Sequence, residues 1–230
     1  MGNGRGARPC PRGENKMGNA NISRCLSRAA LGVGFALLAI WPGIAAVQSK
    51  AKIEGLKKEL RDSADEFVKL IEPLTDEQWN FKAPKIRHTA GNEAEHIALA
   101  ENDLQRVIQR ALAADADPAK AKELAGKEDK IKDLMLHPKR RAEAYKVPGR
   151  LNSKAEVQEF FRRAHRNLMD LIETSSDLEI HVYKHPTKIY GDLTALQWFH
   201  FIAYHKRRHI EQIRTIMALP DFPSASASAD

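Results

Sequence analysis

Two histidines four residues apart, His205 and His209, lie in a stretch, residues 192–217, whose apolar residues recur with helical spacing. At about 100° per residue, such a pair lies about 40° apart on one helix face. Ile202 shares a stripe with His209, and Trp198 shares one with His205, so both imidazoles are predicted to face the interior. Two inward imidazoles one turn apart can share a metal ion when another element supplies further ligands.

A third candidate ligand, His96, lies on another stretch with helical spacing, residues 90–114, where Leu99 and Val107 share its face. Three neutral imidazoles would leave coordination positions open for water or substrate, as a catalytic metal requires. Nitrogen ligands suit Zn²⁺, Ni²⁺ and Fe²⁺ alike, so the spacing is compatible with a divalent metal without choosing its identity. An H-x-x-x-H pair on a helix is nevertheless more often structural. Spacing alone therefore leaves open that all three are polar residues of the core.

Few other side chains near these histidines could assist chemistry. Asp103 lies one heptad after His96 and could orient it or act as a weak general base, although an edge salt bridge is the simpler interpretation. Glu101 is the other weak candidate for a base. Within the basic run 206–208, predicted to be a solvated rim, Arg208 lies nearest the histidine pair and could contact an anionic substrate. No catalytic residue is assigned.

The remaining histidines are predicted to lie outside the cluster. His200 lies about 140° around the helix from His205, which is too far to share one ion. The others are predicted to be surface or loop residues, and two of them lie in a loop that could border the mouth of the site: His88, His165, His181 and His185.

Four amphipathic helices are predicted to position these residues. Beside 90–114 and 192–217, they are 49–72 and a helix that begins with a capping box at Ser153 and ends before Asp177. Asp192 is predicted to cap the last helix, and no strand is predicted. The lysine-rich connection 115–150, with a short helix at 119–136, is long enough to join parallel neighbours or to cross one end. The prediction is an all-α fold, a four-helix bundle with a long crossover connection.

An N-terminal leader is predicted to precede this fold. Residues 29–47 carry no charge, follow Arg24 and Arg28, and end in small residues, which is typical of a signal peptide cleaved after Ala45 or Ala46. An uncleaved transmembrane anchor is the alternative, although the apolar run barely spans a bilayer. Met17 would serve as an alternative start to Met1. The body would then be exported, periplasmic or extracellular, or anchored by this segment. The predicted domains are the leader 1–46, the bundle 47–219 and a disordered tail 220–230.

The formal charge of +7 gives no reason to expect a nucleic-acid partner. Six basic residues and one acidic residue lie in the first 46 positions, so the rest of the chain carries only +2. Cys10 and Cys25 also lie in the leader, so the predicted bundle has neither a disulfide nor a thiol of its own. An exposed helix face would allow a homodimer, although no heptad seam stands out.

Two segments carry a resemblance to a known family. The stretch EAEHIALAE at residues 93–101 and the pattern TALQW-x₆-HKRRHIEQI at residues 194–213 resemble the DinB-like superfamily, and the loop LTDEQW at residues 74–79 fits it too. The resemblance covers residues 50–218. It implies a four-helix bundle with a divalent metal held by one histidine of the second helix and an H-x-x-x-H pair of the last.

Carried over by position, the implied ligands are His96, His205 and His209, and Gln212 matches the residue that follows the pair in the family. Relatives of this kind use the metal in thiol transfer or isomerisation, and others are thought to be hydrolases. The resemblance therefore implies a metal-dependent transferase or hydrolase acting on a small molecule, with a thiol cofactor for the transferase. Export argues against a cytosolic thiol. A non-catalytic metal- or ligand-binding bundle and a purely structural bundle remain the alternatives.

Overall fold

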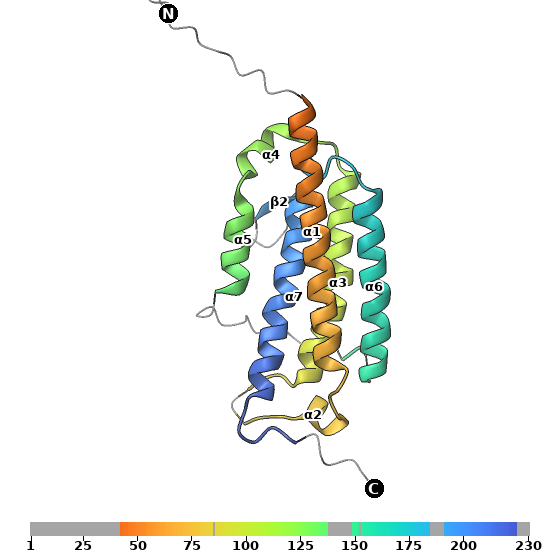
Figure 1. Cartoon of the computed structure of the whole chain (residues 1–230), viewed down its shortest axis with the longest axis vertical. Helices are drawn as coiled ribbons and strands as arrows, with labels where there is room; N and C mark the ends of the chain where they lie inside the picture. Colours follow the sequence, from red (N-terminus) through yellow and green to blue (C-terminus); the bar gives the residue numbers. More distant parts are fainter. Residues whose placement is uncertain (1–41, 85, 138–148, 152, 185–190, 225–230) are drawn as a thin grey trace, which may run out of the picture. The chain divides into compact units, whose positions relative to one another are not determined.

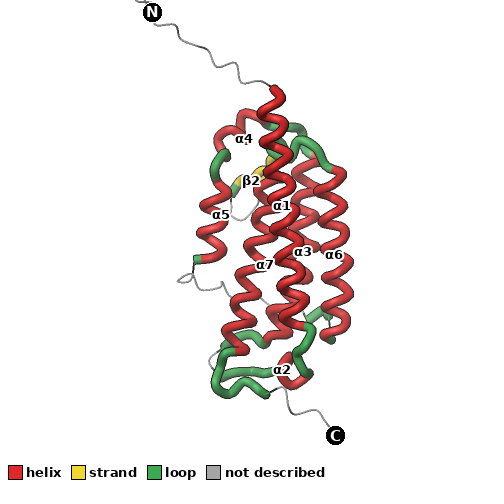
Figure 2. Tube along the Cα trace, viewed as in Figure 1, coloured by secondary structure: helices red, strands yellow, loops and turns green. Residues whose placement is uncertain are grey.

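The computed structural model describes residues 42–84, 86–137, 149–151, 153–184 and 191–224, with side chains from Lys50 onwards. Within these residues the chain forms seven helices and one two-stranded antiparallel sheet, so the predicted all-α class is confirmed (Figures 1 and 2). The elements are α1 (Pro42–Ile71), α2 (Asp76–Asn80), α3 (Ala90–Ala113), α4 (Pro118–Leu124), α5 (Lys127–Leu136), α6 (Lys154–Thr174), β1 (Val182–Lys184), β2 (Asp192–Thr194) and α7 (Ala195–Met217).

The helix α7 is the central helix of the packing. It contacts α1, α3 and α5, while α3 also packs on α6, and α1 on α6 (Figure 1). Burial of the apolar stripes of these helices supplies most of the driving force for folding. The largest apolar side chains that they bury are Trp198, Phe67, Phe161, Phe199, Phe201, Leu56, Leu60, Ile71, Ile97, Ile108 and Leu168. Polar groups that enter this core therefore need partners there.

The neighbouring helices α3 and α6 run parallel, as hydrogen bonds at their two ends show. Near the start of α3, the buried Glu95 carboxylate accepts backbone N–H groups of Gly149, Arg150 and Leu151 at 3.3, 2.6 and 3.1 Å, just before α6 begins. Beyond the other end of α3, the His181 ring bonds the Ala114 carbonyl at 3.0 Å. The long connection between the two helices therefore joins parallel neighbours.

The described part of this connection forms two helices in place of the single one predicted at 119–136. They are separated at Gly126, whose φ of 78° lies in the left-handed region that glycine adopts without strain. The second of them, α5, lies against α7 and buries Ile131 and Met135. The connection thus contributes to the core.

The start of α7 differs from the prediction in two ways. Asp192 does not cap the helix but lies in β2, which pairs with β1, so the expectation of no strands was wrong. The cap is Thr194, whose hydroxyl accepts the Gln197 N–H while the Gln197 side chain accepts the Thr194 N–H. This reciprocal pair satisfies two N–H groups that the helix itself leaves unbonded.

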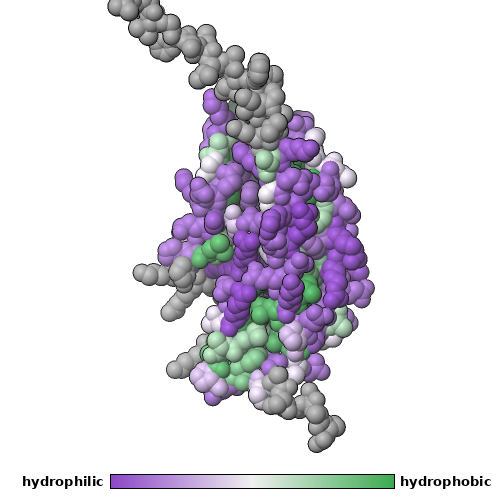
Figure 3. Space-filling view, viewed as in Figure 1, coloured by the Kyte–Doolittle hydropathy of each residue, from purple (hydrophilic) through white to green (hydrophobic). Residues whose placement is uncertain are grey.

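A short helix, α2, that was not predicted covers one end of the long helices. Its Trp79 packs against Gly91 in the first turn of α3, where a Cβ would lie 2.4 Å from the indole nitrogen. Only glycine at position 91 permits this close approach. Apolar surface gathers at the end that carries α2, where Phe81 and Phe222 meet edge to face (Figure 3).

The predictions for the leader fall mostly outside the described residues, since residues 1–41 are not among them. Pro42 begins α1, in keeping with the tolerance of proline at the first helical position. The tail beyond residue 224 also lies outside. Among the described residues, no helix combines the length and apolar character needed to span a bilayer.

Candidate metal centre

The helices α3 and α7 bring three histidines to one point. The Nε2 atom of His205 lies 3.3 Å from Nε2 of His96 and 3.2 Å from Nε2 of His209. One ring nitrogen from each residue lies within 4.8 Å of the other two. The sequence pairs two of these residues by spacing, and the packing of α3 on α7 brings in the third.

These separations match those that a shared ion would impose. Metal–nitrogen bonds of about 2.0–2.1 Å place two ligand nitrogens about 2.9–3.4 Å apart, for octahedral to tetrahedral angles. Both measured Nε2–Nε2 distances fall in this range. The ring centroids are 4.5–5.1 Å apart, and the rings are tilted rather than stacked. The three nitrogens therefore converge without the rings having to move far.

The cluster lies at the edge of the buried core. His209 is 3% exposed, whereas His96 and His205 are partly exposed. Along the stripe of α3 that carries His96, Ala100 is partly exposed and Asp103 is exposed. A water molecule or a small ligand could therefore approach the cluster from this side.

Burial keeps two of the rings neutral. It lowers the pKa of His96 to about 3, with a further contribution from the nearby His209, and it lowers the pKa of His205 well below its usual value, again helped by His209. A neutral imidazole has a ring-nitrogen lone pair, which is the form that binds a cation. The surroundings that disfavour an imidazolium therefore favour ligation.

A buried carboxylate orients the third ring. Nδ1 of His209 donates to Oε2 of Glu93 at 2.7 Å, which places the ring proton on Nδ1 and leaves the Nε2 lone pair directed at the other two histidines. The other oxygen of Glu93 accepts from Nδ1 of His88 at 3.1 Å. Both carboxylate oxygens of Glu93 thus accept hydrogen bonds from imidazoles. This arrangement is typical of residues that support metal ligands.

The sequence prediction missed Glu93 and did not foresee the contact that His88 makes with it. Glu93 precedes His96 by three residues and so shares its helix face, which is the signal that could have identified it. His88 lies in the loop before α3, in keeping with its prediction as a surface or loop residue, but its side chain is only 11% exposed and contacts Glu93.

Of the three residues proposed from the sequence to assist the cluster, Asp103 and Arg208 contact other groups. Asp103 pairs with Arg106 at 3.7 Å on the surface, the simpler of its two interpretations. Arg208 donates to the Leu134 carbonyl of α5 at 3.4 Å, and its charge contributes to the lowered pKa of His205 after burial and the neighbouring histidines. Gln212 buries its Oε1 atom, which has no hydrogen-bond partner among the described residues.

The prediction of a solvated basic rim was wrong for Lys206. This side chain is 2% exposed, forms a 2.7 Å ion pair with Glu101, and lies over the Phe161 ring at 5.1 Å. Glu101 also accepts from Nδ1 of His165 at 2.7 Å, so His165 is not a surface residue either. Lys206 lies about 100° from His205 on the helix and therefore faces the interior towards α6. Because the Glu101 carboxylate contacts Lys206 and His165, Glu101 is a poor candidate for a catalytic base.

Two further histidines that the structure describes, His200 and His181, stay outside the cluster, as predicted. Nδ1 of His200 lies 3.4 Å from Glu59, and His181 bonds a backbone carbonyl near the end of α3. His185 lies outside the described residues.

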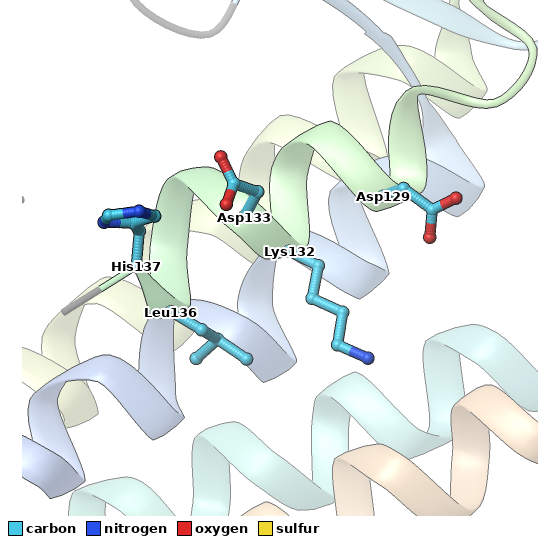
Figure 4. Close-up of a pocket in the computed structure, with 5 residues that line it drawn as sticks. All are labelled: Asp129, Lys132, Asp133, Leu136 and His137. Atoms are coloured by element: carbon cyan, nitrogen blue, oxygen red, sulfur yellow. The ribbon is translucent and has the colours of Figure 1, made fainter.

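Two surface hollows elsewhere contain none of the three histidines. One lies on α5, where Asp133 and His137 project to one side and Lys132 and Leu136 to the other, so these side chains do not converge (Figure 4). The second lies where α4, α5 and α7 begin and is lined in part by Lys52, Lys122, Glu128, Glu179, Gln197 and His200. Among the described residues, only the three histidines form a group able to hold a metal ion.

Comparison with known proteins gives one match. The sequence model of a protein family described as the DinB superfamily matches residues 59–213, which run from the middle of α1 to the last turns of α7. No curated protein and no solved structure gives a match.

Proposed function

The chain belongs to the DinB superfamily, and we propose that His96, His205 and His209 bind one divalent metal ion with at least one coordination position left open. The observation that carries this proposal is the convergence of the three Nε2 atoms at distances that a shared ion would impose. The proposal includes the four-helix bundle of this family, made here of α1, α3, α6 and α7. The donor set fits the ion, because three nitrogen ligands suit Zn²⁺, Ni²⁺ or Fe²⁺.

The residues around the ion would each have a definite task. His96 and His205 present neutral rings, and Glu93 holds the His209 ring with its Nε2 towards the ion. When bound, the ion supplies a Lewis acid that polarises a ligand and lowers the pKa of a coordinated water or thiol. The partly exposed His96 side of the cluster admits the small molecule. We propose a metal-dependent transferase or hydrolase on this basis.

The metal site is tested by metal analysis of protein purified without a histidine tag. We expect about one divalent ion per chain, and its loss in a His205→Ala/His209→Ala double variant, because one remaining imidazole binds weakly. A His200→Ala variant is the matched control, since it removes a histidine of the same helix outside the cluster. Metal that is substoichiometric and unchanged in the double variant would contradict the proposal.

A second candidate is a metal-binding protein without catalytic activity. It is favoured by the two carboxylates considered as bases, because Glu101 is engaged by Lys206 and His165, and Asp103 lies on the surface. Screening the metal-loaded protein against thiols with electrophiles and against esters separates the two candidates. Turnover that disappears with the metal supports the enzyme, and turnover that persists without metal rejects the proposed mechanism.

We propose that the N-terminal segment directs the protein out of the cytoplasm or anchors it in the membrane. The support is the uncharged run 29–47 behind Arg24 and Arg28. Fractionation of expressing cells together with the N-terminal residue of the mature chain is the test. A mature chain that starts near residue 46 in the soluble exported fraction indicates cleavage, whereas an intact chain in the cytoplasm contradicts both forms.

A further inference from the structure

The buried Glu93 carboxylate contacts the histidine cluster through Nδ1 of His209, the ring nitrogen that does not face the other two histidines. Its side chain is 6% exposed, its Oε2 atom accepts from His209 Nδ1 at 2.7 Å, and its Oε1 atom accepts from His88 Nδ1 at 3.1 Å. A carboxylate taken out of water is stable only when such partners compensate its charge. The chain therefore retains a buried negative charge directly behind one of its candidate ligands.

We propose that Glu93 is a positioning residue of the metal site and that His88 extends the site by holding Glu93 in place. This inference rests on the proposed metal function. Glu93 fixes the Nδ1–H form of His209, so that Nε2 is the unprotonated nitrogen on the side of the cluster. Its charge also makes the His209 ring a stronger donor to a cation, because a hydrogen bond from Nδ1 to an anion raises electron density on the ring.

His88 supports Glu93 from outside the helix. It immediately precedes Thr89, the residue that caps α3, and its ring holds the oxygen of Glu93 that does not contact His209. A carboxylate bound at one oxygen only could rotate about its last side-chain bond. Bound at both oxygens, it presents Oε2 to His209 in one orientation. His88 therefore acts on the metal site mainly through Glu93.

Zinc affinity separates this role from general support of the fold. Glu93→Gln keeps the size of the side chain and an oxygen acceptor but removes the charge, and Glu93→Ala removes both. We expect zinc affinity, measured by competition with a chromophoric chelator, to fall about 10-fold in Glu93→Gln and about 100-fold in Glu93→Ala. The matched control is Glu95→Gln, a buried carboxylate of the same helix that binds backbone N–H groups and no histidine. We expect its zinc affinity to equal that of the wild type.

The part of His88 is tested by a double-mutant cycle. His88→Ala should weaken zinc binding less than Glu93→Ala does, and should have no further effect in the Glu93→Ala background. Equal losses in both backgrounds would show that His88 does not act through Glu93.

The ring form of His209 is measured on the metal-free protein by ¹⁵N NMR of its imidazole nitrogens. We expect the Nδ1–H form in the wild type and in Glu95→Gln, and a mixture of both forms in Glu93→Ala. This readout is independent of whether a metal binds. If the wild type binds no zinc, the proposed function and this inference fall together. If it binds zinc and Glu93→Gln binds it equally well, or if His209 carries its proton on Nε2, the inference falls alone.

Discussion

Two carboxylates of α3, Glu93 and Glu101, are both buried and differ in what they support. Each accepts from an imidazole and contacts a second basic group on α7. Glu101 faces the full charge of Lys206, in a network that ends at Phe161 and His165 within the core. Glu93 binds a ring whose other nitrogen faces two further imidazoles.

The difference between the surroundings of Glu93 and Glu101 shows how a buried charge that supports a functional site can be told from one that only stabilises the fold. Burial and short contacts are alike at the two sites, so neither quantity distinguishes them. The two sites differ in what the partner of each carboxylate, Lys206 or His209, contacts besides that carboxylate. The Lys206 ammonium contacts the Glu101 carboxylate and the Phe161 ring, whereas His209 has a nitrogen aimed at a point where three such atoms converge. Perturbing the two sites should therefore affect different measurements.

The largest expected effect comes from breaking the Glu101 network. Lys206→Met leaves the Glu101 carboxylate in the core with His165 as its one remaining partner among the described residues. We expect the free energy of unfolding to fall by about 3–5 kcal/mol in denaturant titrations. A Glu101→Met/Lys206→Met double variant should recover much of this loss, since no unpaired charge remains. A loss of less than about 1 kcal/mol in the single variant would mean that the pair behaves as if it were exposed to solvent.

The second-largest effect is expected in the increase of unfolding free energy that zinc causes, which should differ between variants of the Glu93 site and of the Glu101 site. Saturating zinc adds stability in proportion to the logarithm of affinity, about 1.4 kcal/mol for each tenfold. The zinc-induced increase in unfolding free energy should be about 1.4–2.7 kcal/mol smaller in Glu93 variants than in the wild type, from the 10–100-fold affinity range of supporting residues. In Lys206→Met it should be unchanged, whatever the stability without metal. An equal increase in both variants would remove the contrast between the sites.

A smaller effect is expected from pH. Burial alone would raise the pKa of Glu101, but the charges and hydrogen bonds of Lys206 and His165 outweigh it, so the pKa lies below its usual value of 4.5. The stability that this depressed pKa confers is present above pH 4.5 and is lost as the pH falls through the lower value of the folded state. The difference in unfolding free energy between wild type and Glu101→Gln, measured from pH 7 downwards, should therefore shrink below pH 4.5. A difference that stays constant down to pH 3 would show that the pKa of Glu101 is the same in the folded and unfolded protein, so that it is not lowered by folding.

The smallest effect is expected at Asp103. Its side chain is 57% exposed and pairs with Arg106 at the surface, so Asp103→Asn should change unfolding free energy by no more than about 0.5 kcal/mol. Zinc affinity should also be unchanged. A clear loss of affinity would restore Asp103 as a residue that supports His96.

Helical periodicity carries much of what the sequence could predict. It correctly places His96, His205 and His209 on inward faces, because one face of each helix is a continuous apolar stripe. The boundaries of α3 are also close to the predicted 90–114, since the helix begins at a good cap, Thr89. Periodicity could not predict that α3 would pack on α7 in the register that joins these residues, because register depends on contacts far apart in sequence.

Charged residues were the main source of error. Lys206 stands in a basic run and Glu93 in the first turn of a helix, two contexts in which a charge is usually solvated. Each is buried because a partner of opposite character arrives from another element, which no local pattern reveals. The strands β1 and β2 were missed because segments of three residues are too short to show alternation.

The distribution of the three histidines has a consequence for how the chain reaches its native state. His205 and His209 are adjacent on one helix, whereas His96 is 109 residues away from His205. Contacts between such distant segments form late, since the chain must first close a long loop. Before α3 docks on α7, a cation can therefore bind at most two of the three cluster histidines, His205 and His209. Full affinity would appear only when α3 has docked on α7, so metal loading would act as a checkpoint for completed folding.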